Sequence, residues 1–280
     1  MSAACNFTPR RVIVSACVCF VHSRRSSMRK RLIPVLLLDN HRRLVKTVKF
    51  GGRTYVGDPF NVVRLFNEKE VDEICVLDID ASVRGRAPDF GFIRELSSEC
   101  FMPLAYGGGI TELVHCEQLN RAGVEKFVLG HAALDEELVK SVSRDIGSQA
   151  IAACIDVKGK GNLARCVTRA ARNNTGRKPL ELCRELQDLG VGEIILQSVD
   201  MDGARTGYDL ELIREVSRNL TVPVVALGGA GEAQHLAQAL HAGASAAASG
   251  STFVFIGKLR AVLITYPNPE QMDLLAKAHA

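Results

Sequence analysis

Carboxylates that follow predicted strands are the residues best placed for acid–base chemistry. The full set is Asp39, Asp78, Asp80, Asp156, Asp200 and Asp202. General acid–base catalysis requires a group within hydrogen-bond reach of the substrate, and the ends of neighbouring strands converge on one opening. Asp156 is the strongest candidate because it ends the apolar run 150–155, where an aspartate that merely contacts solvent is not expected.

Glycine-rich stretches also follow predicted strands, at 107–109 and 228–231, and Gly250-Ser251 follows another. Glycine lets backbone N–H groups approach an anion without obstruction by a Cβ, and a helix N-terminus adds the positive end of a dipole. We therefore expect a phosphorylated or similarly anionic small molecule to bind here. Asp202-Gly203 follows a further strand and is a second candidate, although Asp-Gly is also a common tight turn.

Four charged residues lie at the opposite ends of predicted strands. They are Arg31, Glu73, Lys126 and Glu193. If their side chains point inward, two cations and two anions form a ring that closes the bottom of a barrel, as a salt-bridge gate over an axial channel. The alternative is four unrelated surface charges, and position in the sequence leaves both interpretations open.

The elements that position these residues alternate regularly. Runs rich in Val, Ile and Leu alternate with amphipathic stretches, as in parallel strands joined by helices. Strands are expected at 31–38, 73–79, 102–107, 124–129, 149–156, 192–198, 222–227 and 244–250, and helices at 59–69, 89–97, 112–121, 134–146, 179–189, 209–218, 232–241 and 268–278. Eight strands predict a (β/α)8 TIM barrel, with an open doubly wound sheet as the alternative.

The two halves of the chain echo each other. The segments that begin at Glu73 and Glu193 are similar, as are the two glycine-rich stretches, and both pairs are about 120 residues apart. This spacing predicts a half-barrel pseudo-repeat.

Composition narrows the function classes. A chain of 280 residues with 47% hydrophobic residues can bury one large core, and we expect residues 28–280 to form a single barrel. Seven basic residues precede Asp39, the first acidic one, so the remainder has no basic field of the kind that binds nucleic acid. Nine cysteines without a CxxC pair predict reduced thiols in the cytoplasm. No His, Cys or carboxylate cluster has metal-ligand spacing, and we expect neither a metal nor a cofactor.

The first 27 residues differ from the rest of the chain. Their apolar stretch, 12–21, is flanked by arginine pairs and is too short to span a bilayer. We interpret 1–27 as an extension, either disordered or a mis-assigned start, because the first strand begins within four residues of Met28. A signal peptide is the alternative.

Together these residues resemble the cyclase subunit family of imidazole glycerol phosphate synthase. The likeness extends from about residue 30 to about residue 255, and it rests on Lys30-Arg31-Leu32-Ile33, Gly57-Asp58-Pro59, Ala81-Ser82-Val83, Gly107-Gly108-Gly109-Ile110, Ile155-Asp156, Asp202-Gly203 and Gly228-Gly229-Ala230-Gly231. The family takes ammonia from a glutaminase partner, passes it through the barrel beyond a charged gate, and closes an imidazole ring on a bis-phosphorylated substrate.

The resemblance assigns roles to individual residues. Arg31, Glu73, Lys126 and Glu193 match the gate, and Asp156 matches one of two catalytic carboxylates. Phosphate-binding positions match Gly109, Asp202, Gly203, Gly229 and Ser251, with Gly250 beside the last of these.

Two positions depart from the family pattern. Leu37 stands where the family has its other catalytic aspartate, and Asp39 lies two residues further, about 6–7 Å along the same face of the strand, as an uncertain substitute. Gly130-His131 replaces an amide and a hydroxyl residue after another strand.

These departures are closer to a divergent paralogue of the family, a barrel encoded with surface-polysaccharide genes. It works with a glutaminase and a sugar amidotransferase to convert an acetamido group into an acetamidino group. We favour this function over the cyclase reaction of histidine biosynthesis. A non-catalytic scaffold for the glutaminase and a barrel isomerase of the histidine pathway are further alternatives.

Overall fold

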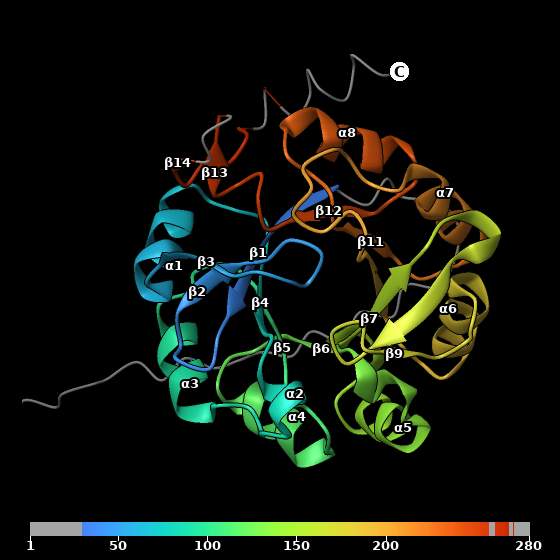
Figure 1. The fold of residues 1–280 in the computed structure, drawn as a ribbon. Coiled ribbons are helices and arrows are strands. Elements are labelled where there is room, and N and C mark those ends of the chain that lie inside the picture. Colours follow the sequence, from blue (N-terminus) through green and yellow to red (C-terminus); the bar gives the residue numbers. More distant parts are fainter. Residues whose placement is uncertain (1–29, 258–260, 269–270, 272–280) are drawn as a thin grey trace, which may run out of the picture.

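The protein forms a closed barrel of eight parallel strands, in a computed structural model that describes residues 30–257, 261–268 and 271. The strands are β1 (Arg31–Leu38), β4 (Ile74–Asp78), β5 (Leu104–Gly107), β6 (Lys126–Leu129), β7 (Ile151–Lys158), β10 (Glu193–Ser198), β11 (Val224–Leu227) and β12 (Ala246–Ser249). β1 pairs with both β4 and β12, and β7 pairs with β10, so the sheet has no open edge. Figure 1 shows the view along the barrel. The TIM-barrel prediction is confirmed, and the open-sheet alternative is wrong.

Helices cover the outside of the barrel between successive strands (Figure 1). They are α1 (Pro59–Glu68), α3 (Phe90–Ser98), α4 (Leu113–Arg121), α5 (Glu136–Asp145), α6 (Pro179–Asp188), α7 (Leu210–Asn219) and α8 (Ala233–His241). Aspartates cap the first turns of four of them, and Pro59 and Pro179 occupy first turns, where the missing N–H is not needed. These helices and all eight strands lie within two residues of their predicted bounds. The expected helix at 268–278 and the extension 1–27 fall largely or wholly outside the described residues.

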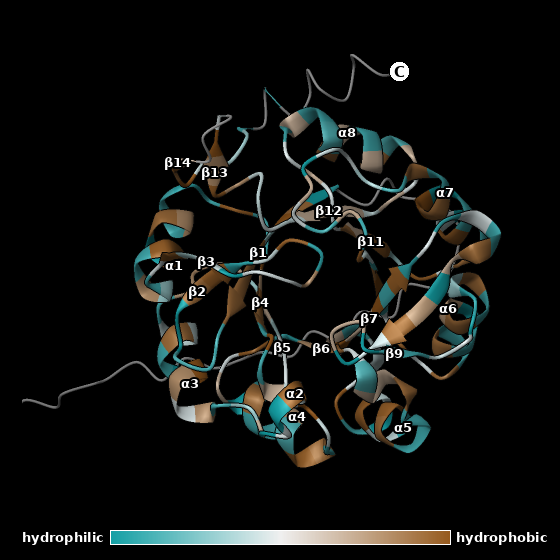
Figure 2. Ribbon diagram, viewed as in Figure 1, coloured by the Kyte–Doolittle hydropathy of each residue, from teal (hydrophilic) through white to brown (hydrophobic). Residues whose placement is uncertain are grey.

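Two hydrophobic cores hold the barrel. The larger lies between the strands and the helices, and it includes Phe66, Phe127 and Leu119. The smaller fills the inside of the barrel and is rich in small residues: Ala105, Ala152, Ala246 and Ala248. Figure 2 shows the strands largely in hydrophobic colours and the helices with both kinds of residue. The alternation along each strand divides its side chains between the two cores.

Short elements at the carboxyl ends of the strands were not predicted. A hairpin of β2 (Leu44–Lys46) and β3 (Thr54–Gly57) follows β1, and a second of β8 (Arg165–Thr168) and β9 (Asn173–Asn174) follows β7. A one-turn helix, α2 (Ala81–Arg84), follows β4. Further short elements are the 3-10 helices η1 (His131–Leu134) and η3 (Gly161–Leu163), and the strand pair β13 (Phe255–Ile256) and β14 (Ala261–Val262). The 3-10 helix η2 (Ser148–Ala150) lies instead at the amino end of β7. The two hairpins bring additional side chains to the mouth of the barrel.

The six described cysteines are free, and four of them are fully buried. Burial raises the pKa of all six thiols, so they remain protonated near neutral pH. Within the described ranges, every helix is too short or too polar to cross a bilayer.

Candidate functional site

A cavity of about 280 Å³ opens at the carboxyl ends of the strands. Most of the predicted site residues of this face line it: Asp156, Asp202, Gly203, Gly229, Gly250 and Ser251. Asp39 and Gly109 are not among its lining residues. A larger groove, of about 890 Å³, lies beside β13 and is lined by Arg205, Phe253 and Tyr266 among others. Of the predicted anion-binding stretches, only Gly231 reaches it.

Asp156 is the carboxylate best suited to proton transfer. It lies on β7, directly across from Val167 of β8, and its nearest side-chain contact of hydrogen-bond type is the Cys154 thiol, with Sγ 3.9 Å from Oδ1. Burial and, to a smaller extent, the negative charge of Asp202 raise the pKa of Asp156 to about 7. A carboxyl group with this pKa can both accept and release a proton near neutral pH.

Lys46 is a cavity residue that the sequence analysis missed. It ends β2, is buried, and donates from Nζ to the Val35 carbonyl at 2.6 Å. Burial lowers its pKa to about 7, although the charge of Asp202 acts in the opposite direction. The only signal in the sequence is a lysine in a polar loop after the first strand, and nothing there indicates that the loop folds back as a hairpin.

Asp202 holds the loop after β2 over the cavity. Its Oδ2 accepts from Thr47 Oγ1 at 2.9 Å and from the Phe50 backbone N–H at 3.3 Å. Gly203 follows with a φ of +64°, and a Cβ there would lie 2.3 Å from the Thr47 carbonyl oxygen. This close approach explains the need for glycine after the aspartate.

A glycine cradle lies on the β11–β12 side of the cavity. At Gly229 φ is +113°, and a Cβ would lie 2.0 Å from the Gly207 carbonyl oxygen. At Gly250 a Cβ would lie 3.0 Å from Lys46 Nζ, so the cradle faces the buried lysine. The Ser251 N–H donates to Ser249 Oγ at 3.2 Å, which orders the turn after β12. Bare backbone and a nearby amine suit an anion.

The carboxylate of Asp39 is bound by residues of its own loop. Its Oδ2 accepts from Arg43 Nη2 at 2.8 Å, and its Oδ1 accepts from the backbone N–H groups of His41 and Arg43 at 2.9 and 3.0 Å. Burial acts to raise its pKa, but these hydrogen bonds outweigh burial and hold the pKa below its ordinary value. Leu37, not Asp39, lines the cavity, so the structure does not bring Asp39 together with Asp156.

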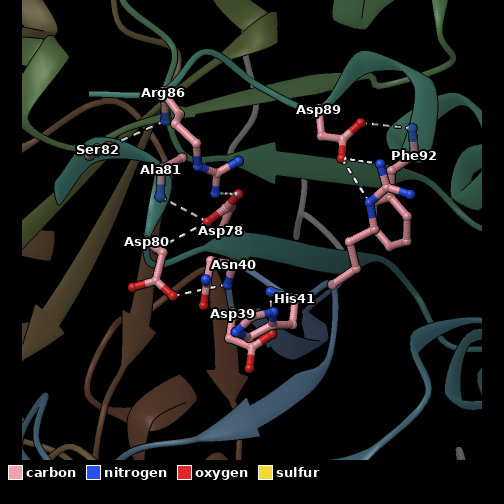
Figure 3. A network of polar contacts seen from close by, with 12 residues as sticks. Asp39, Asn40, His41, Asp78, Asp80, Ala81, Ser82, Arg86, Asp89 and Phe92 are labelled. Atoms are coloured by element: carbon pink, nitrogen blue, oxygen red, sulfur yellow. Dashed lines mark hydrogen bonds and ion pairs between the residues drawn. The ribbon is translucent and has the colours of Figure 1, made fainter. Parts of the chain in front are cut away.

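The carboxylates at the end of β4 are both bound by arginines, and Figure 3 shows the pair of Asp78 with Arg86 and the hydrogen bond from the Asn40 N–H to Asp80. Asp78 accepts from Arg86 at 3.2 Å, and Asp80 pairs with both terminal nitrogens of Arg53 at 2.7 Å. The Arg53 guanidinium, despite burial, lowers the pKa of Asp80 to about 2. These two aspartates are therefore committed to ion pairs at the rim.

Two other predicted residues on this face are held by local hydrogen bonds. The backbone N–H of Gly109 donates to Ser82 Oγ at 3.2 Å, and Asp200 accepts from the Gly159 N–H at 2.8 Å. The Gly109 N–H therefore points to a protein side chain and not to the cavity.

The tip of the β8–β9 hairpin carries two further arginines that line the cavity, Arg169 and Arg172. Three consecutive residues without glycine, 169–171, have φ between 54° and 61°. L-residues in this left-handed region cost about 1–2 kcal/mol each. The hairpin therefore holds its tip in a strained turn.

At the opposite end of the barrel, the four predicted gate residues contact one another. Arg31 donates to Glu73 at 2.5 Å and also pairs with Glu193. Lys126 Nζ lies 3.0 Å from Glu73 Oε2 and 2.9 Å from Glu193 Oε2. Each cation thus bridges both anions, and the side chains of the glutamates are only 5% and 7% exposed. The four side chains form a closed ring of charges.

The comparisons with known proteins consistently match one family. The family model described as Histidine biosynthesis protein matches residues 31–260. The provisionally named imidazole glycerol phosphate synthase subunit hisF2 of Pseudomonas aeruginosa is 46% identical over 250 residues, which cover 88% of this chain and 99% of the relative. The similarly named subunit hisF3 of Vibrio vulnificus is 42% identical and covers 87% and 95%. The imidazole glycerol phosphate synthase subunit HisF of Pyrobaculum aerophilum is 37% identical and covers 80% and 90%.

Proposed function

The chain belongs to the histidine biosynthesis protein family as a divergent HisF-like member, and from this premise we propose that it conducts ammonia through its barrel. Ammonia enters from a glutaminase that docks at the amino ends of the strands. It reacts in the cavity at the carboxyl ends with an anionic small molecule.

The closed ring of Arg31, Glu73, Lys126 and Glu193 is the observation that carries this proposal. Buried charges are costly unless they are paired, which keeps the ring assembled. In this proposal the pairs open briefly as ammonia passes and then re-form. The core inside the barrel beyond the ring is apolar, with alanines among larger aliphatic residues. An apolar passage admits neutral ammonia far more readily than the ammonium ion, because desolvation of a charge is costly.

In the upper cavity, Asp156 is the acid–base group. When the nitrogen of ammonia forms a bond to an electrophilic carbon it becomes positively charged, and a carboxylate with a pKa of about 7 can take up the proton it loses. The glycine cradle at Gly229 and Gly250 holds an anionic group of the acceptor. Lys46 lies beside the cradle and adds positive charge when protonated.

We further propose that the acceptor is an acetamido sugar in surface-polysaccharide biosynthesis, with a sugar amidotransferase as the third partner in the cytoplasm. Leu37 lines the cavity, and Asp39 is bonded to Arg43. By resemblance to the family, cyclisation uses a second carboxylate at the position of Leu37, so leucine there favours the sugar pathway. The two relatives with numbered HisF names are 46% and 42% identical to this chain, against 37% for the HisF subunit of Pyrobaculum aerophilum.

The principal alternative is the cyclase subunit of histidine biosynthesis, which yields imidazole glycerol phosphate and AICAR. Asp156 and the glycine cradle, which the cavity retains, favour it. A non-catalytic scaffold for the glutaminase would require neither residue. The HisF names of the reported relatives argue against a barrel isomerase.

A reconstitution with the glutaminase and the sugar amidotransferase of the same organism tests the proposal. We expect Lys126→Ala to lower acetamidino-sugar formation from glutamine at least tenfold and to leave formation from added ammonia unchanged. Lys140→Ala, an exposed lysine on α5, is the matched control and should leave both rates unchanged.

An equal loss with glutamine and ammonia would reject the gate. Turnover of the bis-phosphorylated ribulosyl-formimino precursor with ammonia at an ordinary enzymatic rate would support the histidine alternative over the sugar pathway.

A further inference from the structure

Arg205, in the loop that joins β10 to α7, has a backbone conformation that favours glycine. Its φ is +62°, in the left-handed region that is unfavourable for a residue with a Cβ. The same loop has glycine at its two other positions with positive φ, Gly203 at +64° and Gly207 at +104°. Local strain of this kind persists where the surrounding structure or the function needs the side chain. An arginine at this position therefore indicates a role for its side chain.

The guanidinium of Arg205 bridges two other loops. Nη2 donates to the Gly231 carbonyl at 3.2 Å, and Nη1 donates to the Gly257 carbonyl at 3.1 Å. Gly231 ends the glycine-rich stretch after β11, and Gly257 follows β13, in the segment after β12. A planar guanidinium presents its donors in a fixed fork, so it can hold two acceptors at a set separation. The side chain thus ties the loop after β11 to the loop after β12.

The backbone around Arg205 also contacts the glycine cradle directly. The Gly207 N–H donates to the Gly229 carbonyl at 2.9 Å. A Cβ at Gly231 would lie 2.4 Å from the Arg205 Cβ. Because the two segments touch without room for another side chain, a displacement of residues 205–207 would move the backbone of the cradle.

The other loop of the cradle is joined to Gly257 by local hydrogen bonds. The N–H groups of Val254 and Phe255 donate to the Ser251 carbonyl at 3.2 and 2.9 Å. Phe255 is the first residue of β13 and lies two residues before Gly257. The bond from the guanidinium to Gly257 therefore also holds Ser251. Since Gly229 and Ser251 belong to the two loops of the cradle, one side chain sets the distance between these loops.

Arg205 itself lies outside the cavity. It lines the larger groove beside β13 and is not among the residues that line the cavity. The two hydrogen bonds of its guanidinium go to backbone carbonyls. Its effect on an anion in the cradle is therefore transmitted by the backbone.

We propose that Arg205 is a positioning residue, which holds the loops after β11 and β12 at the separation that lets their backbone bind one anionic group of the acceptor. The inference rests on the proposed function in one respect, the binding of an anion by the glycine cradle. It adds the reason for the strained backbone, because this position needs both a left-handed turn and a side chain that reaches two carbonyls at once.

Arg205→Gly separates the side chain from the turn. Glycine suits the left-handed backbone, and relief of the strain offsets the loss of two hydrogen bonds, so the urea midpoint should stay close to that of the wild-type protein. Calorimetric titration with glucose 6-phosphate, whose single phosphate is the probe for the cradle, should give an affinity at least tenfold weaker. In the reconstituted reaction with added ammonia, the KM for the acceptor should rise at least tenfold while kcat changes less than twofold.

Two further variants serve as controls. Arg205→Lys keeps the positive charge but lacks the planar fork, so it should also weaken glucose 6-phosphate binding at least fivefold. Arg214→Gln removes a positive charge from an exposed position on α7 and should leave both the affinity and the urea midpoint unchanged.

An affinity of Arg205→Gly within about twofold of the wild-type value would overturn the proposal, as would full affinity in Arg205→Lys, which would leave only the charge as the cause. A loss of affinity accompanied by unfolding would reduce Arg205 to a residue that holds the fold. The titrations involve neither ammonia nor the glutaminase. Failure of this inference is therefore distinguishable from failure of the ammonia gate, which the Lys126→Ala rates report.

Discussion

The two ends of the barrel differ in whether their charged groups have ion-pair partners. At the lower end, Arg31 and Lys126 each bridge Glu73 and Glu193, so every charge has two partners. At the upper end, Asp156 is half-buried and Lys46 is buried. Among the described residues Asp156 has no cationic partner, and Lys46 donates to a carbonyl alone.

The two ends therefore differ in whether their groups can change protonation state near neutral pH. At the lower end, burial acts to lower the pKa of Arg31, but the two glutamates outweigh it and raise the pKa. At the upper end, burial brings the pKa values of Asp156 and Lys46 to about 7 from opposite directions. The lower ring is thus suited to controlling entry without exchanging protons, and the upper cavity is suited to proton transfer.

Removal of one anion from the lower ring should have the largest effect on stability. Glu193→Ala leaves Arg31 and Lys126 with only Glu73 between them, and the loss of one partner from a buried ion pair costs about 3–5 kcal/mol. Urea denaturation measures the change. Glu181→Ala, which breaks an exposed pair with Lys178, should have little effect. A loss below 1 kcal/mol for Glu193→Ala would mean that the ring is solvated like a surface network.

The upper cavity should produce a stability minimum near pH 7. The folded-state pKa of Asp156, about 7, exceeds the ordinary value of about 4, so its contribution to stability falls as the pH rises from about 4 to 7. The folded-state pKa of Lys46, also about 7, is below the ordinary value of about 10.4, so its contribution rises again from pH 7 to about 10.

Two variants separate these contributions. Relative to the wild-type protein, Asp156→Asn should remove the fall on the acid side, and Lys46→Met should remove the rise on the alkaline side. Each change amounts to about 2 kcal/mol, since the cavity is partly open to water. Thermal and urea unfolding from pH 4 to 10 measure both. Parallel stability curves for the wild-type protein and both variants would contradict the assignment of these two groups.

Asp39→Asn should have the smallest effect on stability. It also tests whether Asp39, unlike Asp156, lies outside the ligand-binding cavity. It weakens the pair with Arg43, whose side chain is 56% exposed, so we expect a loss of about 1 kcal/mol in the free energy of unfolding. Because Asp39 does not line the cavity, sugar-phosphate affinity should remain unchanged. A tenfold loss of sugar-phosphate affinity in a folded Asp39→Asn variant would show that Asp39 contributes to ligand binding after all.

Much of the fold follows from local patterns. Apolar strand runs, prolines in first turns and amphipathic stretches place the eight barrel strands and the helices α1 and α3 to α8 within two residues of their observed bounds. The hairpins were missed because β2, β3, β8 and β9 are only two to four residues long, too short for a periodic pattern. β2 and β8 form by pairing with the barrel strands β1 and β7, and β3 and β9 pair with β2 and β8 in turn. The cavity residues on them, Lys46, Arg169 and Arg172, were missed for the same reason.

By itself, the sequence determined the barrel, the strand ends at which polar residues gather, and the glycines that allow close backbone approach, since all three depend on residues near one another in the chain. Only the tertiary structure decided which charges find partners. Arg31 and Glu193 are 162 residues apart in sequence, and Thr47 and Asp202 are 155 apart. Such contacts depend on closure of the whole barrel. The burial that results from this closure, and not residue type, brings the pKa values of Asp156 and Lys46 to about 7.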